Sequence, residues 1–227
     1  MRSSFPDEAD AYRQARDRLL RMEVELRRLT ESVAAARRAL PPGGVVPQNY
    51  TFEGLGELSA PQPVTLLDLF EPGKDTLFTY NMMFPRSLDE DLPCPSCTQF
   101  LDSFDGVAEH AGQRINVAVV AKTSLKRLLQ HAQSRGWRHM RLLSSANSSF
   151  NRDYHGEDEQ GQQLPMLNVF QRQRDVVRHF WGSELLFEPG DPGQDQRHGD
   201  TIDPLWNLFD LTPDGRGIDW YPDMKYE

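Results

Sequence analysis

The sequence has little cysteine and no long hydrophobic run. Only 2 of its 227 residues are cysteine, which is too few for a disulfide scaffold. No stretch approaches the roughly 18 consecutive apolar residues that indicate a membrane-spanning helix. The opening residues, MRSSFPDEAD, lack the apolar core that a secretory signal peptide needs. We therefore expect a protein that does not enter a membrane and that stays in the cytoplasm.

Basic residues are fewer than acidic ones. The chain carries 25 Lys and Arg against 34 Asp and Glu, a formal net charge of −9. Binding to nucleic acid needs a basic surface that neutralises phosphates, so this balance argues against nucleic acid as a general partner. Hydrophobic residues make up 38% of the chain, enough for one domain with an appendage or for two small domains.

Residues 10–40 contain no glycine or proline and repeat an apolar residue every three or four positions. This spacing predicts one amphipathic helix with charged residues on its other faces. A helix of about 30 residues is about 45 Å long, more than one small domain can cover. We expect an arm that packs against a second subunit and makes a homodimer; the alternative is a helix lying partly on its own domain. The apolar seam consists of Tyr12, Ala15, Leu19, Met22, Leu26, Leu29, Val33, Ala36 and Leu40.

Proline separates this helix from the rest of the chain. The stretch PPGG follows the helix, and its prolines end it because they cannot continue the hydrogen-bond ladder. The proline-rich residues 41–63 are typical of an extended connector. We therefore divide the chain into an N-terminal helical arm with its linker, residues 1–45, and a domain with a C-terminal extension, residues 46–227.

Beyond the arm, apolar segments of strand length and helix length alternate. The strand candidates are residues 76–84, 115–121 and 140–145, with an amphipathic helix after each of the first two. Such alternation predicts an α/β structure with parallel strands at its centre. Two further strand candidates, residues 164–171 and 176–181, predict a hairpin that adds an antiparallel edge.

The two cysteines, Cys94 and Cys97, stand three positions apart, after a predicted strand and before a predicted helix. The unpaired N–H groups and the dipole at a helix N-terminus favour a thiolate there. We expect Cys94 to be the attacking thiolate, because it is nearer the helix end and, in our interpretation, more exposed. Cys97 lies on the same face one turn further in, where it can close an intramolecular disulfide as the resolving thiol.

Two other interpretations of the cysteine pair remain open. A single C-x-x-C is a modest signal, and the thiols can also be an unused structural pair or part of a metal site. Structural zinc usually takes four ligands, and the sequence offers no second pair at metal-ligand spacing. We therefore expect no metal and no other cofactor.

The chain as a whole resembles a family of bacterial thioredoxin-like proteins of formally unknown function, described as predicted dithiol-disulfide oxidoreductases. The resemblance covers residues 10–217 and rests most specifically on CPSCTQFLDSFDG, FNRDYH and LFDLTPDGRG. It implies a thioredoxin-like fold, a central mixed sheet flanked by helices, with a long N-terminal helical arm. It also implies that Cys94 and Cys97 occupy the redox position, and it brings no substrate with it.

The sequence departs from thioredoxin around the cysteines. Pro93 precedes Cys94 where thioredoxin has tryptophan, and Pro95 and Ser96 stand between the cysteines in place of Gly-Pro. We expect Pro95 and Ser96 to contact substrate and to tune the redox potential. Peroxiredoxins need Thr or Ser three positions before the attacking cysteine, and this chain has Asp91 there, which disfavours a dedicated peroxidase.

Two segments are further candidates for substrate contact. In the thioredoxin fold a cis-proline opens the strand that faces the active-site helix, and Leu164 and Pro165 stand at such a position. We expect this bond to be cis; an ordinary trans-proline at a strand start is the alternative. Asn151, Asp153 and Tyr154 can line the cleft beside the cysteines as substrate contacts or a proton relay, with local turn chemistry as the alternative.

These features favour an enzyme that exchanges thiols and disulfides on a protein or a small-molecule substrate. The alternative is a non-catalytic binding protein that holds a small ligand or a protein partner on the same scaffold. The intact C-x-x-C favours the enzyme, because a binding module has no need to retain it. We expect Trp206, Phe209, Trp220 and Tyr221 to be packing residues that tie the C-terminal tail to the sheet.

Overall fold

The computed structural model describes residues 5–56, 59–217 and 220–225. Its contacts divide the chain into two compact units, Met1–Pro42 and Gly43–Glu227. The second unit begins where the chain first joins the sheet: the carbonyl of Gly44 accepts the N–H of His179 at 3.0 Å, and the N–H of Val46 donates to the carbonyl of Val177 at 2.9 Å.

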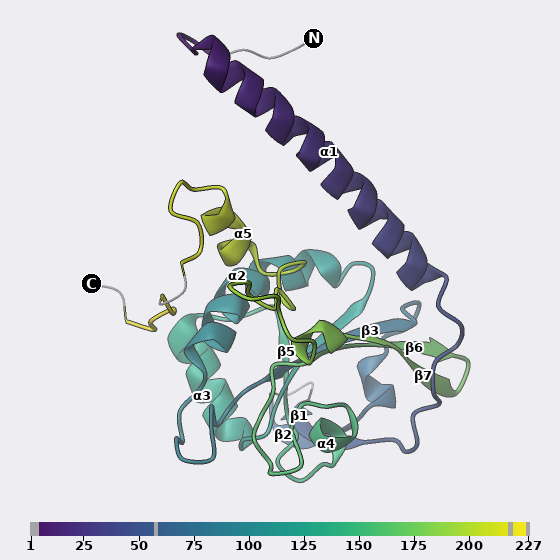
Figure 1. Cartoon of the computed structure of the whole chain (residues 1–227). Helices are drawn as coiled ribbons and strands as arrows, with labels where there is room; N and C mark the ends of the chain where they lie inside the picture. Colours follow the sequence, from purple (N-terminus) through teal and green to yellow (C-terminus); the bar gives the residue numbers. More distant parts are fainter. Residues whose placement is uncertain (1–4, 57–58, 218–219, 226–227) are drawn as a thin grey trace. The chain divides into compact units, whose positions relative to one another are not determined.

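The first unit is built on one long helix, α1 (Asp10–Arg38), which confirms the predicted helical arm (Figure 1). No residue of α1 is buried. The large side chains of its seam are open to solvent, from 40% exposed at Val33 to 68% at Met22. Charged pairs such as Arg28 with Glu25, at 2.5 Å, lie on its surface. The helix therefore presents an apolar stripe bordered by charges of both signs.

One seven-stranded sheet organises the second unit, in the order β2-β1-β5-β4-β3-β6-β7. Strands β3, β4 and β5 are parallel. Strand β6 is antiparallel to β3 and β7 is antiparallel to β6, which confirms the parallel centre and the antiparallel hairpin. The strands are β1 (Thr51–Leu55), β2 (Pro61–Thr65), β3 (Thr76–Met82), β4 (Asn116–Ala121), β5 (Arg141–Ser144), β6 (Leu167–Gln173) and β7 (Val176–Gly182).

The interpretation of residues 41–63 as an extended connector is wrong for its second half. Strands β1 and β2 form an antiparallel pair there, with Thr51 opposite Thr65 and Leu55 opposite Pro61. β2 is the edge strand, and an edge tolerates proline because its outward N–H positions need no partner. The prolines of β2 therefore led to the prediction of a connector, although pairing with β1 makes this segment a strand.

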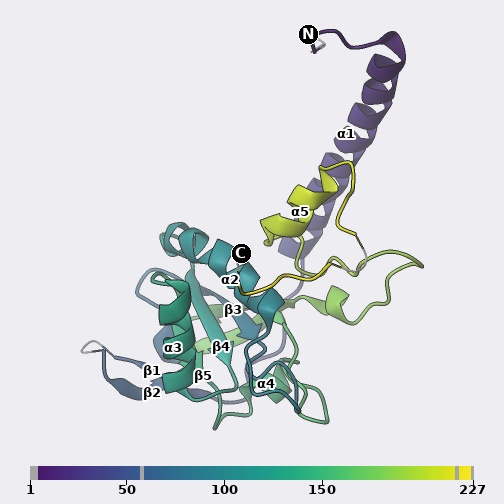
Figure 2. The same cartoon turned by 90° about the vertical axis from the view of Figure 1, so that its left-hand side faces the viewer.

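Alternation along the central strands sends side chains to two cores. Tyr80 and Met82 of β3 face one core and Leu77 faces the other. Helices α2 (Pro95–Ala111) and α3 (Leu125–Arg135) cover the first face, as Figure 2 shows. The second face is covered by the segments that contain the short helices η1 (Leu67–Leu69) and α4 (Phe150–Asp153). This layering is the predicted thioredoxin-like α/β fold.

Helix α2 forms because its apolar residues recur on one side. Phe100, Leu101, Phe104 and Ala108 of α2 are all buried. The Phe100 ring lies 4.7 Å from that of Tyr80 in edge contact, centroid to centroid. These contacts fix the start of α2 against the end of β3, where the cysteines lie.

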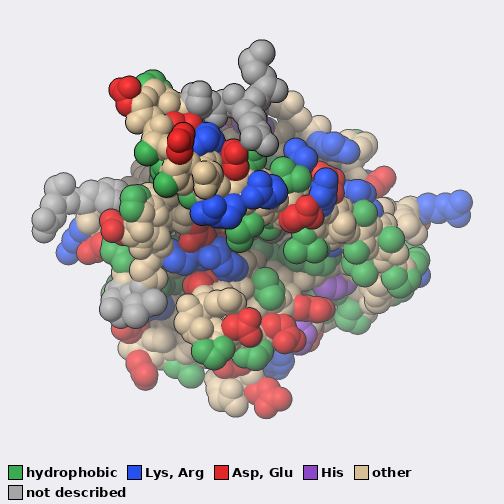
Figure 3. Space-filling view, turned by 45° about the horizontal axis from the view of Figure 1, so that its top comes forward, with side chains coloured by type: hydrophobic (Ala, Val, Ile, Leu, Met, Phe, Trp, Pro, Cys, Tyr) green, Lys and Arg blue, Asp and Glu red, His purple; other side chains and the backbone are tan. Residues whose placement is uncertain are grey.

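The chain after β7 carries two short helices, η2 (Glu184–Leu186) and α5 (Pro204–Asp210). Asp203 caps α5, its carboxylate accepting the N–H of Leu205 at 3.0 Å. Among the described residues, no helix combines the length and the apolar character needed to span a membrane. On the face drawn in Figure 3, acidic and basic side chains are interspersed, with hydrophobic side chains between them.

Candidate active site

The two cysteines lie at the N-terminus of α2. Cys94 is the N-cap residue, and Pro95 opens the first turn, where its missing N–H costs nothing. The sulfur of Cys94 accepts the backbone N–H of Cys97 at 3.4 Å. The Cys94 backbone is itself fixed, because its N–H donates to the carbonyl of Met83 at 3.0 Å. Both thiols are free.

The helix terminus and the neighbouring groups give the two thiols different pKa values. The pKa of Cys94 falls from 9.0 to about 6, because the Cys97 thiol, the Tyr221 hydroxyl and the N–H groups of Cys97 and Ser96 donate to its sulfur. Burial opposes this shift without cancelling it. Burial and the nearby Cys94 sulfur raise the pKa of Cys97 well above its usual value. The arrangement therefore holds one thiolate and one protonated thiol at neutral pH.

Neither cysteine is open to solvent. Cys94 is 0% exposed and Cys97 is 1% exposed, so the expectation that Cys94 is the more exposed thiol is wrong. The physical reason is the C-terminal segment, which brings Tyr221 over the start of α2. The Tyr221 hydroxyl lies 3.4 Å from the Cys94 sulfur.

Tyr221 is the contact that sequence reasoning missed. We expected it to be a packing residue, like its aromatic neighbours in the tail. Its ring instead lies under the guanidinium of Arg86, at 5.5 Å from the ring centroid, and its hydroxyl faces the sulfur. Burial and the hydrogen bond to Cys94 raise the pKa of Tyr221, so the hydroxyl stays protonated. No local pattern signals this contact, because 127 positions separate the two residues.

Tyr80 is a second missed residue. Its hydroxyl hydrogen-bonds to the Cys97 thiol, and this contact lowers the pKa of Cys97 against the larger effect of burial. Burial raises the pKa of Tyr80 itself well above the usual value. Strand alternation offered a signal here, because Tyr80 shares with Met82 the face that α2 covers.

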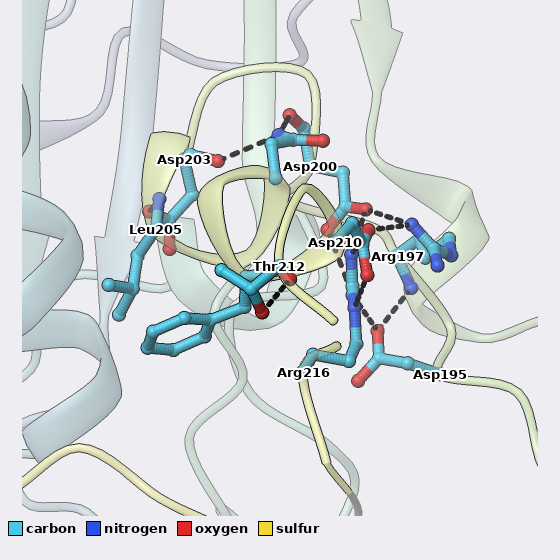
Figure 4. A network of polar contacts seen from close by, with 10 residues as sticks. Asp195, Arg197, Asp200, Asp203, Leu205, Asp210, Thr212 and Arg216 are labelled. Atoms are coloured by element: carbon cyan, nitrogen blue, oxygen red, sulfur yellow. Dashed lines mark hydrogen bonds and ion pairs between the residues drawn. The ribbon is translucent and has the colours of Figure 1, made fainter. Parts of the chain in front are cut away.

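The C-terminal segment is held together by a network of charges, drawn in Figure 4. The guanidinium of Arg216 contacts the carboxylates of Asp210 at 2.5 Å and Asp200 at 2.8 Å. Arg197 contacts Asp210 at 2.7 Å. These pairs keep the pKa of Asp210 well below its usual range. Asp195 adds a longer contact to Arg216 at 3.4 Å.

Aromatic packing and two anchors complete the segment. The rings of Trp206, Phe209 and Trp220 pack edge to face, with Phe209 and Trp220 at 5.1 Å. Gln99 of α2 donates to Asp203 at 3.1 Å, and Arg135 of α3 donates to the carbonyl of Met224 at 3.1 Å. The segment is thus fastened to both helices beside the cysteines.

A cavity of about 810 Å³ lies between this segment and the first turns of α2. Cys97 lines it, whereas Cys94 does not. The volume is within the usual range for sites that hold small molecules, roughly 300–1,000 Å³. The lining residues include Tyr80, Met83, Ser96, Cys97, Phe100, Pro165, Asp195, Arg197, Asp200, Asp203, Trp206, Arg216, Trp220 and Tyr221.

The sequence matches the family described as bacterial protein of unknown function (DUF899) over residues 3–226. The chain belongs to the DUF899 family. The resemblance to a bacterial family of unknown function is therefore confirmed, while the oxidoreductase activity stays a prediction. No curated protein matches the sequence of this DUF899 chain.

Solved structures similar to the DUF899 chain include three peroxiredoxin-type proteins. The reduced 2-Cys peroxiredoxin of Plasmodium vivax is 15% identical, with a TM-score of 0.45 over 74% of this chain and 95% of that one. Peroxidoxin BcpB of Mycobacterium tuberculosis is 17% identical, with a TM-score of 0.44 over 73% and 95%. A peroxiredoxin-like protein of Aquifex aeolicus is 13% identical, with a TM-score of 0.41 over 63% and 75%. Because these identities are low, the chemistry of the site is derived from its own residues.

Leu164 and Pro165 are placed differently by the structure. Pro165 lines the cavity with Cys97, whereas the N–H of Leu164 donates to the carbonyl of Gly156 at 2.9 Å, away from the cavity lining. The expected cis bond between them is wrong. The one cis peptide bond in the described part of the DUF899 chain joins Phe84 and Pro85.

Asn151, Asp153 and Tyr154 are not brought to the cysteines, contrary to the prediction. They belong to α4 and its C-cap, and Tyr154 is buried in the core on the opposite face of the sheet. Asp153 accepts the hydroxyl of Tyr50 at 2.7 Å. The Asn151 amide donates to Gln163 at 3.0 Å. Both partners are side chains from other parts of the chain, 103 and 12 positions away, so these contacts support the fold on that face and are not the turn chemistry held as the alternative.

Metal-ligating side chains do not gather in the described residues of the DUF899 chain. There, no group of three or more His, Cys, Asp or Glu side chains is arranged to hold an ion. A ring nitrogen of His131 instead pairs with the hydroxyl of Thr98, the residue after Cys97, at 3.0 Å. Burial lowers the pKa of His131.

Proposed function

We propose that this DUF899 chain is a thiol-disulfide oxidoreductase, with Cys94 as the attacking thiolate and Cys97 as the resolving thiol. One observation carries the proposal. The Cys94 sulfur caps α2 and collects several hydrogen-bond donors, while the Cys97 thiol beside it is buried and protonated. A low-pKa cysteine paired with a high-pKa cysteine one turn away is the arrangement that this chemistry needs.

The steps follow from that difference in acidity. The Cys94 thiolate attacks one sulfur of a substrate disulfide, which breaks the S–S bond and releases one substrate thiolate. A mixed disulfide between Cys94 and the substrate remains. The Cys97 thiol then loses its proton and attacks the Cys94 sulfur, which releases the second substrate thiolate. The substrate gains two electrons and the enzyme ends with a Cys94–Cys97 disulfide.

The proposed cycle needs a reductant and a compartment. A dithiol of low potential must reduce the Cys94–Cys97 disulfide before the next turnover. The cytoplasm, which the sequence predicts as the location, supplies such dithiols and keeps thiols reduced. Run in reverse with an oxidised partner, the same steps form a disulfide in the substrate.

Two cysteine variants test this function. Cys94→Ser should abolish reduction of a disulfide substrate, because the attacking sulfur is gone. Cys97→Ser should still attack and should accumulate the mixed disulfide, which mass spectrometry detects as a covalent adduct on Cys94. Disulfide reduction that survives in Cys94→Ser would contradict the assignment.

The cavity beside Cys97 favours one other function, a binding protein for a small ligand. Its aromatic and charged lining is suited to a ligand without any redox step. Reversible loss of two thiols per chain on oxidation favours the oxidoreductase. Two thiols that never oxidise reversibly favour the binding protein.

We also propose that the protein is a homodimer formed through α1. The helix buries none of its own residues, and its apolar seam repeats at heptad spacing. Acidic and basic residues border the seam, among them Arg18 and Glu25, so a second copy brings complementary charges to it.

A further inference from the structure

We propose that Tyr221 is a catalytic residue of this site. Its hydroxyl donates a hydrogen bond to the Cys94 thiolate, and its ring controls access to that sulfur. As a result, the enzyme takes low-molecular-weight disulfides in preference to folded proteins. This inference rests on the proposed oxidoreductase function and adds a residue and a substrate class to it.

The contact itself is geometric. The Tyr221 oxygen lies 3.4 Å from the Cys94 sulfur, the same distance at which the N–H of Cys97 reaches that sulfur. The backbone donor belongs to the helix terminus that the cysteine caps, whereas Tyr221 approaches from a different part of the chain. A thiolate at Cys94 accepts from both donors, and each favours the charged sulfur over the neutral one.

Two contacts other than the one to the Cys94 sulfur set the position of Tyr221. The Arg86 guanidinium lies over its ring, and Arg135 holds the carbonyl of Met224 three residues further along. Arg86 also places a positive charge beside the phenol. The raised pKa of Tyr221 keeps its proton on the oxygen, so the hydroxyl is a donor at neutral pH.

The ring is the outer layer of the site. Tyr221 is 48% exposed, whereas the sulfur beneath it is 0% exposed. A protein disulfide therefore cannot reach Cys94 unless the ring and its segment move away. A small disulfide needs a smaller movement, because the cavity of about 810 Å³ already extends to Cys97 and is lined by Tyr221 itself. Movement of one ring connects that cavity with the Cys94 sulfur.

Two substitutions separate the hydroxyl from the ring. The measurement is the rate of alkylation of Cys94 by iodoacetamide against pH in the full chain, with the modified residue identified by mass spectrometry. Tyr221→Phe keeps the ring and removes the donor. Its titration midpoint should rise by about one pH unit, because one hydrogen bond to a charged acceptor is worth roughly that much. Its high-pH rate should match the wild type.

Tyr221→Ala removes both the donor and the ring. Its midpoint should rise as in Tyr221→Phe, and its high-pH rate should increase about tenfold because the sulfur no longer depends on local opening of the segment. The same variant should gain activity on a folded protein with a surface disulfide, relative to its activity on oxidised dithiothreitol. Circular dichroism establishes that both variants are folded.

Tyr50→Phe is the matched control. It also removes a hydrogen-bonded phenol hydroxyl, the one that contacts Asp153 on the opposite face of the sheet. Its Cys94 profile should be that of the wild type. A shift in Tyr50→Phe equal to that in Tyr221→Phe would overturn the specific role of Tyr221.

The outcomes distinguish this inference from the proposed function. A wild-type midpoint near pH 6 that is unchanged in Tyr221→Phe overturns the hydrogen bond from Tyr221 and leaves the proposed oxidoreductase function standing. An unchanged high-pH rate in Tyr221→Ala overturns the role of the ring. A wild-type midpoint near the ordinary value of 9.0 removes the thiolate on which the oxidoreductase itself depends.

Discussion

At the scale of single residues, the site is a set of donors around two sulfurs. Tyr80 precedes the cysteines in the sequence and lies on a central strand, whereas Tyr221 follows them and lies in the C-terminal segment. Each contacts a different sulfur, Tyr80 with Cys97 and Tyr221 with Cys94. The two steps of the proposed exchange are therefore open to separate perturbation.

Tyr80→Phe should slow the resolving step and leave the attack intact. The Tyr80 hydroxyl lowers the pKa of Cys97, so its removal leaves less thiolate to attack the mixed disulfide. We expect the mixed disulfide on Cys94 to persist about fivefold longer, since one hydrogen bond is worth about 1 kcal/mol. Quenched-flow mass spectrometry measures its lifetime. An unchanged lifetime, with normal alkylation of Cys94, would show that Tyr80 has no part in resolution.

At the scale of elements, the C-terminal segment depends on the pairing of Arg216 with Asp200 and Asp210. The Arg216 side chain is largely buried, so the loss of its charge leaves two carboxylates without that partner. We expect Arg216→Ala to loosen the segment and to expose Cys94, which increases the alkylation rate several-fold at high pH. Arg114→Ala, at an exposed position before β4, is the control and should react like the wild type.

A normal alkylation rate in Arg216→Ala would mean that aromatic packing and the anchors at Gln99 and Arg135 hold the segment without the charge network. Hydrogen exchange of residues 200–217 checks the same point directly, because amide protection in a loosened segment falls.

The second element open to test is α1. Leu26 lies in the apolar seam and is 64% exposed, so Leu26→Asp should place a charge in the proposed dimer interface. We expect sedimentation to show a dimer for the wild type and a monomer for this variant. Arg28→Ala, two positions away and outside the seam, should stay dimeric. A monomeric wild-type protein would refute the dimer.

Sequence patterns predicted most elements because local spacing determines them. The continuous apolar run became β4, the helix after the cysteines became α2, and Gly136 ends α3 in the left-handed conformation with φ of 80°. Strand β2 was missed because its prolines oppose the local preference and only pairing with β1 overrides it.

The site was predicted only in part, for a related reason. The position of the cysteines at a helix start follows from neighbouring residues. The cover over Cys94 comes from a residue far along the chain, and no periodicity reports such a contact. The assignment of Asn151 and Tyr154 to the cleft failed because their loop crosses to the other face of the sheet. Tertiary packing, not local sequence, determines that crossing.

At the scale of the whole molecule, the thiolate couples stability to pH. The pKa of Cys94 is lower in the folded protein than the ordinary value of 9.0. Its contribution to the free energy of unfolding is therefore fully present above pH 9 and is lost as pH falls towards 6. Urea unfolding should show that Cys94→Ser destabilises the protein more at pH 9 than at pH 6, by on the order of 2 kcal/mol. An equal loss at both pH values would indicate that Cys94 is protonated in the native state.

The contact between Tyr221 and Cys94 has a practical consequence for anyone who purifies this protein. A histidine tag inserted a few residues after Tyr221 would lie beside the residues that shelter the reactive sulfur. Thiol reactivity assayed on such material would include the effect of the fusion. A cleavable tag at the opposite terminus avoids this artefact.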